Sequence, residues 1–328
     1  MNDHDLMRAA LAAAESVRLT TAPNPWVGCA IRPVDGVVVT GATQPPGGPH
    51  AERMALDALA PGAAIGATVA VTLEPCSHHG RTPPCADALV AAGVARVLVG
   101  CVDPDPRVSG RGVELLRQHG IDVEVGVLGD EVAEQLRPYL HHRRTGRPFV
   151  VLKMATTLDG RTAASDGSSR WITSPEARRD VHRLRHESDA VLVGAGTVRA
   201  DDPELTVRDL SEGTVVRQPR RIVLGRAPEG AQVHPCTELD GPVDGVLDRL
   251  GDEGVLQLLV EGGAEVAAAF HRAGLVDRYV LYLAPALMGA DGVPLLRGIG
   301  TTTMRDLWRG RIVSATRIGP DLRVVLEP

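Results

Sequence analysis

A histidine and two cysteines stand at spacings that suit a catalytic zinc site. His50-Ala51-Glu52 lies where a loop is expected to become a helix, Cys76 follows a buried strand, and Cys85 opens the next helix. Catalytic zinc takes three protein ligands of the His or Cys type and keeps its fourth position open. The sequence therefore predicts that His50, Cys76 and Cys85 bind a zinc ion.

Glu52 is the candidate catalytic group of this site. It follows His50 by two residues, so its carboxylate can reach the reacting water without binding the metal. A His-x-Glu followed by Pro-Cys and a second Cys is typical of nucleobase deaminases, where the Glu acts as general acid and base. An isolated His-x-Glu is more often an ordinary helix start, but the ordered combination favours a metal site. His78 and His79, between the cysteines, could supply a fourth ligand and make the site structural.

The sequence around these residues resembles the pyrimidine deaminase family of riboflavin biosynthesis. The resemblance rests on residues 74–85 (EPCSHHGRTPPC), with eight residues between the cysteines, and on residues 23–28 (PNPWVG), 48–52 (GPHAE) and 102–112 (VDPDPRVSGRG). It implies a cytidine-deaminase-like, three-layer αβα domain.

Further roles in this domain follow from the same resemblance. It implies that Asn24 holds the pyrimidine, and His78 and Arg81 are the candidates for the ribose phosphate, because an anion is bound by cations near a helix start. Cys29 is expected to pack in the floor of the pocket. The family usually carries a His shortly before the GPHAE run, where this chain has Thr43.

A second group of motifs occupies the other half of the chain. It comprises residues 153–161 (KMATTLDGR), 169–173 (SRWIT), 194–198 (GAGTV), 201–208 (DDPELTVR) and 261–264 (EGGA). The Gly pair lets a pyrophosphate approach backbone N–H groups at a helix start. No Gly-x-Gly-x-x-Gly follows the first strand, so a Rossmann domain is disfavoured. The group resembles the reductase family of the same pathway, which implies a dihydrofolate-reductase-like α/β domain.

The resemblance also implies two sets of site residues in the second half. The residues expected to line the NADPH site are Ala155, Trp171, Thr197, Asp201 and Gly263. The residues expected to contact the reductase substrate are Lys153, Ser169, Arg185, Leu205, Arg208 and Glu261. Arg185 and Arg208 are the expected phosphate clamps, because a guanidinium matches phosphate geometry.

Taken over nearly the full chain, the resemblance implies a bifunctional enzyme with zinc and NADPH as cofactors. The first half would deaminate the pyrimidine ring of 2,5-diamino-6-ribosylamino-4(3H)-pyrimidinone 5′-phosphate. The second half would then reduce the ribosyl side chain to ribityl. The family also implies a homo-oligomer, a dimer or tetramer formed through the second domain.

Composition limits the class of protein. A chain of 328 residues is long enough for two domains, and 44% apolar with 23% charged residues is typical of a globular protein. A net charge of −6 and 2% aromatic residues disfavour nucleic-acid binding. The five cysteines indicate no disulfide framework, and neither a signal peptide nor a membrane-spanning run is visible. We therefore expect a cytoplasmic protein with small-molecule substrates.

Alternating helices and strands predict a layered α/β fold in each half. In the first half we expect helices at 6–19, 51–59, 86–92, 113–119 and 131–140, and strands at 27–31, 37–40, 68–73, 94–99 and 121–127. In the second half we expect strands at 149–154, 190–193, 221–224, 256–260 and 278–284, helices at 174–188 and 264–273, and a hairpin of 312–318 with 322–326. The charged run 141–148 predicts a boundary between a deaminase domain, 1–145, and a reductase domain, 146–328.

Three alternatives remain open at this point. The first is a nucleic-acid deaminase with an appended binding domain. The second keeps the deaminase but makes the second half a non-catalytic module, because the Gly- and Pro-rich stretch 225–254 looks short and poor in strands. The third is a zinc-binding protein that is not an enzyme.

Overall fold

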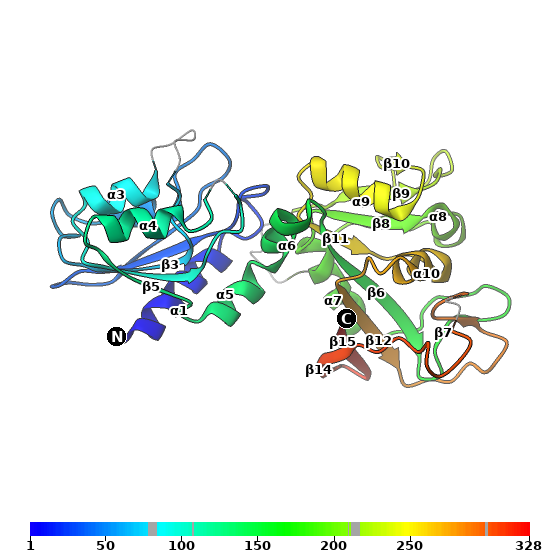
Figure 1. Ribbon diagram of the computed structural model, residues 1–328. Coiled ribbons are helices and arrows are strands. Elements are labelled where there is room, and N and C mark those ends of the chain that lie inside the picture. Colours follow the sequence, from blue (N-terminus) through cyan, green and yellow to red (C-terminus); the bar gives the residue numbers. More distant parts are fainter. Residues whose placement is uncertain (78–83, 107, 209, 211–216, 299–300) are drawn as a thin grey trace. The chain divides into compact units, whose positions relative to one another are not determined.

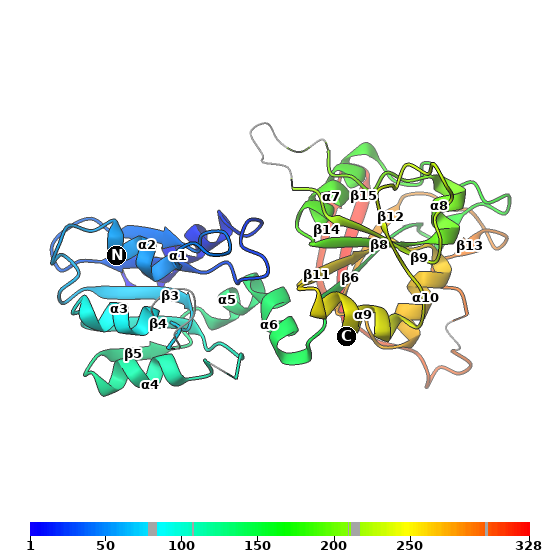
Figure 2. The ribbon, with the colours of Figure 1, turned by 90° about the horizontal axis from the view of Figure 1, so that it is seen from above.

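The chain forms two compact units, Met1–Gly146 and Arg147–Pro328. Figures 1 and 2 show the computed structural model, which describes residues 1–77, 84–106, 108–208, 210, 217–298 and 301–328. The predicted boundary at 145/146 lies one residue before the division between these units. Within the described ranges, no helix is both long enough and apolar enough to cross a membrane.

The first unit is built on a five-stranded mixed sheet. Its strands are β1 (Gly28–Arg32), β2 (Val39–Ala42), β3 (Thr68–Leu73), β4 (Arg96–Cys101) and β5 (Asp122–Val125), in the order β2-β1-β3-β4-β5. β1 is antiparallel to both of its neighbours, whereas β3, β4 and β5 are parallel. The expected hairpin of the first two strands is confirmed, with Gly36 in its turn at φ 142°. β3 carries the chain directly into the Cys76 loop.

Helices cover both faces of this sheet. They are α1 (Asp3–Glu15), α2 (Ala51–Asp57), α3 (Cys85–Ala91), α4 (Arg111–Gln118), α5 (Gly129–Gln135) and α6 (Arg137–Thr145). Figure 1 shows α3 and α4 on one face and α1 and α5 on the other. Glycines allow close approach on both faces, because a Cβ at Gly28 would lie 1.9 Å from the Ala10 carbonyl of α1 and a Cβ at Gly41 would lie 2.3 Å from the Ala51 carbonyl of α2. The predicted three-layer αβα fold is confirmed.

The expectation of a single helix at 131–140, with the charged run 141–148 outside it, is wrong. The structure has two consecutive helices, and the second continues through the charged residues to Thr145. Pro138 suits the first turn of a new helix because its missing N–H would have no partner there. Gly146, at φ 75°, ends the helix in the left-handed conformation.

The second unit contains an eight-stranded sheet in the order β10-β9-β8-β11-β6-β12-β15-β14. Its strands are β6 (Phe149–Thr157), β8 (Ala190–Gly194), β9 (Arg220–Leu224), β10 (Thr237–Leu239), β11 (Gln257–Val260), β12 (Arg278–Ala284), β14 (Arg311–Ile318) and β15 (Asp321–Glu327). The pairs from β10 to β12 are parallel, and the terminal hairpin is antiparallel. The short strands β7 (Arg161–Ala163) and β13 (Val293–Pro294) pair separately.

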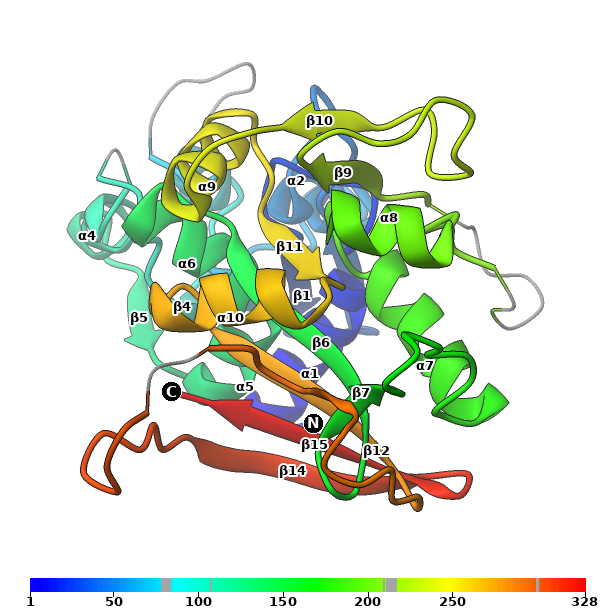
Figure 3. The same cartoon turned by 90° about the vertical axis from the view of Figure 1, so that its right-hand side faces the viewer.

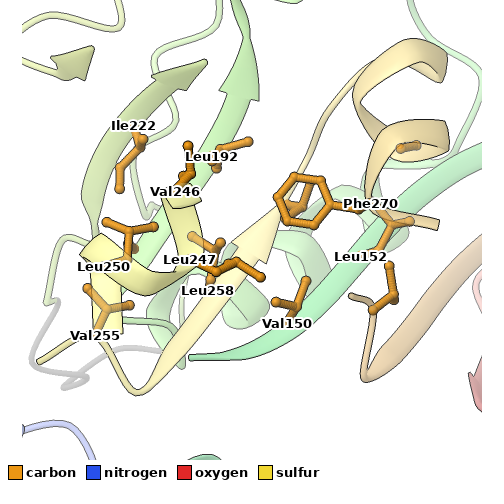
Figure 4. Close-up of a cluster of buried hydrophobic side chains, with 14 of the residues drawn as sticks. Val150, Leu152, Leu192, Ile222, Val246, Leu247, Leu250, Val255, Leu258 and Phe270 are labelled. Carbon is orange, nitrogen blue, oxygen red and sulfur yellow. The ribbon is translucent and has the colours of Figure 1, made fainter. Parts of the chain in front are cut away.

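Two apolar clusters sandwich this sheet. Its helices are α7 (Pro175–His186), α8 (Ala195–Asp201), α9 (Val243–Asp252) and α10 (Ala264–Arg272). Alternate residues of β6 point to opposite faces: Val150 and Leu152 pack with α9 and α10, and Phe149 and Val151 pack with α7 and α8. Figure 3 shows the helices, and Figure 4 shows Phe270 and Leu258 within the first cluster. Because the strands from β10 to β12 are parallel, their carboxyl ends meet along one edge of the sheet.

The stretch 225–254 contains more regular structure than its composition indicated. It holds β10, which extends the parallel sheet, and α9, which packs on the apolar cluster. Val246, Leu247 and Leu250 bury one stripe of this helix. The spacing of these residues is helical, but the glycines at both ends of the stretch favoured its interpretation as a loop.

Candidate active sites

Three separate elements bring the predicted zinc ligands together. His50 is the N-cap of α2, Cys76 lies in the loop after β3, and Cys85 is the first residue of α3. His50 Nδ1 lies 3.6 Å from Cys76 Sγ and 3.3 Å from Cys85 Sγ. The Cys85 backbone N–H also donates to Cys76 Sγ at 3.3 Å.

The donor set fits zinc. One imidazole and two thiols have ligand atoms within 4.8 Å of one another, and all three side chains are buried or half-buried. Three protein ligands leave one position of a tetrahedral zinc ion open, as in catalytic sites. His78 and His79, the possible sources of a fourth ligand, lie outside the described residues, and so does Arg81.

Hydrogen bonding divides the two thiols into one thiolate and one thiol when no metal is present. The Cys85 thiol and the His50 imidazole hydrogen-bond Cys76, which lowers the pKa of Cys76 to about 4. The same bond, together with burial, raises the pKa of Cys85. The pKa of His50 is raised, chiefly by its hydrogen bond to Cys76. A divalent cation would replace these shared protons, because zinc binds the deprotonated forms of its ligands.

Glu52 lies beside the ligands and is almost fully buried. Only 3% of its surface is exposed, and it is hydrogen-bonded with Cys85. Burial, followed by the negative charge of Cys76, raises the pKa of Glu52 to about 7. A carboxyl group with this pKa can both accept and return a proton at neutral pH. Cys29, fully buried on β1, is close enough for the charge of Glu52 to add to the effect of burial in raising its thiol pKa.

Asn24 and Thr43, also singled out in the sequence of this unit, differ in burial and in hydrogen bonding. Asn24 lies in a bend, half-buried, with its backbone N–H bonded to the Thr21 carbonyl. Thr43 is buried, and its hydroxyl accepts from the Val27 N–H at 3.2 Å and donates to the Val27 carbonyl at 3.3 Å. Thr43 therefore uses its side chain to close the end of the β1–β2 pair.

In the second unit, three predicted substrate residues form one half-buried ionic group. Arg185 of α7 makes a bidentate pair with Glu261, with Nε–Oε1 at 2.5 Å and Nη2–Oε2 at 2.9 Å. Arg185 Nη1 also donates to the Thr206 carbonyl at 3.0 Å. Burial lowers the pKa of Lys153 on β6, although the charge of Glu261 opposes this effect. The donors of Arg185 are thus directed at Glu261 and Thr206.

The Gly pair after β11 meets the start of α8. The Gly263 N–H donates to Thr197 Oγ1 at 3.1 Å, so two residues expected at the NADPH site are in direct contact. A Cβ at Gly262 would lie 2.6 Å from the Cβ of Val266, and a Cβ at Gly263 would lie 3.1 Å from Thr197 Oγ1. Glycine is therefore required here for close packing of the turn on its neighbours.

Another two predicted residues join the segment 169–171 to α8. Ser169 donates to Asp201 Oδ1 at 2.9 Å, and Arg170 donates to the Asp201 carbonyl. Trp171 is 68% exposed, and the Arg178 guanidinium lies 4.5 Å from its ring centroid. Arg178 was not among the predicted residues. The helix start at Ser174 and Pro175 places it in the first turn of α7, but nothing in the sequence links it to Trp171.

The remaining predicted residues differ in burial and in their contacts. Ala155 is half-buried on β6 and pairs with Tyr282 of β12. Leu205 is buried with a positive φ of 55°. Arg208 is exposed, and its Nη1 donates to Glu204 Oε2 and Thr206 Oγ1, both at 3.0 Å.

Each half of the chain matches a protein family. Residues 1–101 match the cytidine and deoxycytidylate deaminase zinc-binding region, and residues 148–324 match the RibD C-terminal domain. The chain is 42% identical to the riboflavin biosynthesis protein RibD of Escherichia coli K12, with 98% of each chain covered. It is also 42% identical to RibD of Mycobacterium tuberculosis CDC 1551, with 98% of this chain and 96% of the relative covered.

Solved structures give the same result over the full length. RibD of Acinetobacter baumannii superposes with a TM-score of 0.93 at 38% identity, covering 99% of this chain and 98% of that one. A Thermotoga maritima protein superposes with a TM-score of 0.88 at 35% identity and the same coverage. That protein is described as a diaminohydroxyphosphoribosylaminopyrimidine deaminase and 5-amino-6-(5-phosphoribosylamino)uracil reductase.

Proposed function

The chain belongs to the RibD family of riboflavin biosynthesis proteins, and from this premise we propose which of its residues carry the two reactions. It is a bifunctional enzyme, a zinc-dependent deaminase and an NADPH-dependent reductase that act on small pyrimidine substrates. We assign the deaminase to residues 1–145 and the reductase to residues 146–328. The observation that carries the first assignment is the convergence of His50, Cys76 and Cys85 beside a buried Glu52.

In the deaminase, His50, Cys76 and Cys85 would hold the zinc ion. When bound, zinc lowers the pKa of the attacking water toward neutrality. Glu52 accepts the proton of that water and returns protons to the ring nitrogen and to the leaving ammonia. Its position two residues after a ligand and its pKa of about 7 support both roles. Asn24 holds the pyrimidine, and His78 and Arg81 are the proposed contacts of the ribose phosphate.

The proposed deaminase substrate is 2,5-diamino-6-ribosylamino-4(3H)-pyrimidinone 5′-phosphate, and the reductase then converts its ribosyl group to ribityl. NADPH supplies the hydride when it is bound. The residues proposed to hold NADPH are Ala155, Trp171, Thr197, Asp201 and Gly263. The contact of Gly263 with Thr197 and the exposed face of Trp171 support this assignment.

The reductase substrate would be held by Lys153, Ser169, Arg185, Leu205, Arg208 and Glu261. Arg185 fixes both oxygens of Glu261, so we propose that it orients this carboxylate in the site. Arg208 is then the more available phosphate clamp, because it is exposed and its carboxylate partner Glu204 is also exposed. Ser169 is hydrogen-bonded to Asp201, one of the residues proposed to hold NADPH.

One preparation tests the whole proposal. Zinc content, ammonia release from the pyrimidine phosphate, and NADPH oxidation with the deaminated product are measured on the same full-length protein. We expect bound zinc, ammonia release and NADPH oxidation together. Ammonia release from RNA but not from the pyrimidine phosphate would instead favour a nucleic-acid deaminase. Zinc and ammonia release without NADPH oxidation would make the second unit a non-catalytic module.

We further propose that the protein is a homo-oligomer, a dimer or tetramer, formed by a second copy at the edge of the eight-stranded sheet. Within the described part of the chain, β14 is paired on one side only, and its residues are mostly exposed. Ile312, Val313 and Leu322 present apolar side chains there. Such an edge is a ready template for pairing with another chain.

Light scattering on the full chain tests this assembly. We expect a mass of two or four chains, and we expect Val313→Lys to reduce it to one chain. A single-chain mass for the unmodified protein would reject the proposal. We also propose a cytoplasmic location, since none of the five cysteines forms a disulfide.

A further inference from the structure

A buried carboxylate two residues before Cys76 binds the backbone of a second segment of the chain, residues 103–113. Glu74 is the first residue after β3, and only 4% of its surface is exposed. Its Oε1 accepts from the N–H groups of Gly112 at 2.8 Å and Val113 at 3.3 Å. Its Oε2 accepts from the N–H groups of Gly110 at 2.9 Å and Asp103 at 3.3 Å. Three of these donors belong to the backbone at the start of α4, and the fourth, Asp103, lies in the loop between β4 and that helix.

These bonds make Glu74 the cap of α4. The N-cap residue of this helix is Gly110, which has no side chain to bond the free N–H groups of the first turn. The carboxylate of Glu74 satisfies them from outside the helix, and its negative charge lies at the positive end of the helix dipole. Bonds from N–H groups to an ionised carboxylate are stronger than neutral ones, so this is a firm attachment.

The next residue is held by the same turn of helix. A Cβ at Gly112 would lie 1.9 Å from the carbonyl oxygen of Pro75, so the first turn of α4 rests directly on the Pro75 backbone. Pro75 has no N–H group with which to make a ladder bond. The start of α4 therefore restrains both residues that separate β3 from Cys76.

Apart from the His50 imidazole, the bonds that Cys76 makes within the described residues are with α3. The Cys76 carbonyl accepts from the Ala86 N–H at 3.1 Å, and Cys76 Sγ accepts from the Cys85 N–H at 3.3 Å, as far as the described residues show. β3 ends at Leu73, and the last bond toward β4 runs from the Glu74 N–H to the Cys101 carbonyl at 2.9 Å. Beyond that bond, the side chain of Glu74 attaches the end of β3 to the start of α4.

We propose that Glu74 is a positioning residue of the zinc site, which fixes the location of Cys76 Sγ by clamping the end of β3 to the start of α4. The inference rests on the proposed function, because it takes Cys76 as a zinc ligand. It also gives a role to the motif at 102–112, whose backbone supplies three of the four donors.

The test is the zinc affinity of the full-length Glu74→Gln variant, measured at equilibrium against a chromophoric chelator. The amide keeps the shape but turns an NH₂ group toward two of the N–H donors. Loss of a group that orients a metal ligand costs about 10- to 100-fold in metal affinity, and we expect a decrease in this range. Gly112→Ala should reproduce it, because it displaces Pro75 from the other side without removing a charge. Reductase activity should remain unchanged in both variants.

Tyr139→Phe is the matched control. The Tyr139 hydroxyl donates to the Asp103 carboxylate, with 3.1 Å to Oδ2, so its removal takes a side-chain bond from the same segment but leaves all four N–H groups that bond Glu74 unchanged. We expect lower stability of the first unit with unchanged zinc affinity. Unchanged affinity in Glu74→Gln, or an equal decrease in Tyr139→Phe, would overturn the inference. Absence of zinc from the unmodified protein would instead reject the proposed deaminase site.

Discussion

At the scale of single residues, the environment of Glu52 determines what its carboxyl group can do. Burial and the nearby Cys76 charge bring its pKa to about 7, so neither protonation state is strongly disfavoured at neutral pH. A group that must accept a proton and then return it needs this balance. His50, two residues earlier, keeps it beside the metal position.

Glu52→Gln is expected to abolish most of the deaminase activity without loss of zinc. The amide cannot accept the proton, and general acid–base groups contribute about 10²- to 10⁴-fold to rate. The measurement is kcat for ammonia release, with zinc content determined on the same sample. Glu114→Gln, on the exposed face of α4, is the control and should behave as the unmodified protein. Full activity in Glu52→Gln with zinc retained would support a zinc protein whose Glu52 is not catalytic.

Glu261 makes the stability of the second unit depend on pH. Burial tends to raise its pKa, but the charge and hydrogen bonds of Arg185, with the charge of Lys153, outweigh burial and leave it below the usual 4.5. A carboxyl group with a lowered pKa in the folded state stabilises the fold above its unfolded pKa. That contribution is lost as pH falls through the folded pKa.

We therefore expect the second unit to lose stability below about pH 4.5 in part through Glu261. Glu261→Gln should be less stable near neutral pH by about 3 kcal/mol, because it leaves the half-buried Arg185 guanidinium without its carboxylate partner. It should also show a smaller further loss between about pH 5 and pH 3. Denaturant unfolding followed by Trp171 and Trp308 fluorescence measures both effects. Glu265→Gln, an exposed pair with Arg297, is the control, and an equal pH dependence in the two variants would contradict the assignment.

Residue-level prediction succeeded best where one short motif contained the information. The spacing of His50, Cys76 and Cys85 predicted a cluster, and the structure brings their ligand atoms together. Glu74 and Arg178 were missed for a physical reason. The carboxylate of Glu74 bonds backbone N–H groups 29 to 39 positions away, which any residue type could provide.

At the scale of elements, α2 is held directly against β2 through Gly41. A Cβ at this position would lie 2.3 Å from the Ala51 carbonyl and 2.4 Å from the Ala55 N atom. These backbone atoms belong to the helix that follows His50 and carries Glu52. The close contact between β2 and α2 therefore fixes the positions of the His50 and Glu52 side chains relative to the sheet.

Gly41→Ala is expected to destabilise the first unit and to lower deaminase activity together. Overpacking of this kind costs about 1–3 kcal/mol, and here the helix must move because the contacts are with backbone. Thermal unfolding and ammonia release measure the two effects. Gly245→Ala in α9 is the control: a Cβ there meets nothing within 4 Å, so it should be neutral or stabilising by about 0.5–1 kcal/mol. Unchanged activity in Gly41→Ala would show that the helix position is not critical.

Elements were predictable where apolar periodicity and turn residues agreed. The terminal hairpin and the start of α7 at Ser174 follow such signals and are confirmed. The second half of α6, after Leu140, was not predicted as helix because Arg and His occupy its last turn. β10 and α9 were missed because the glycines around them read as loop, whereas tertiary packing onto the apolar cluster decides the outcome.

At the scale of the whole molecule, each unit has a core of its own. Buried side chains of the first unit include Leu6, Leu98 and Leu116, and those of the second form the two clusters on its sheet. The zinc ligands all lie in the first unit, and the proposed NADPH residues all lie in the second. The two activities should therefore be separable.

Removal of zinc is expected to abolish ammonia release and to leave NADPH oxidation unchanged. The full-length protein is treated with a chelator, and both rates are measured before and after zinc is restored. Cys85→Ser should give the same separation without a chelator, since an alcohol is a poor zinc ligand. A fall in NADPH oxidation in parallel with zinc content would contradict this separation.

The distribution of the five cysteines has a practical consequence. Cys29 is sealed within the first unit, Cys76 and Cys85 face the metal position, and Cys101 and Cys236 are half-buried elsewhere. A thiol-reactive dye should therefore label only Cys101 and Cys236 while zinc is bound, and Cys76 in addition once it has left. The colour released by the dye would gauge metal loading in a preparation without any substrate.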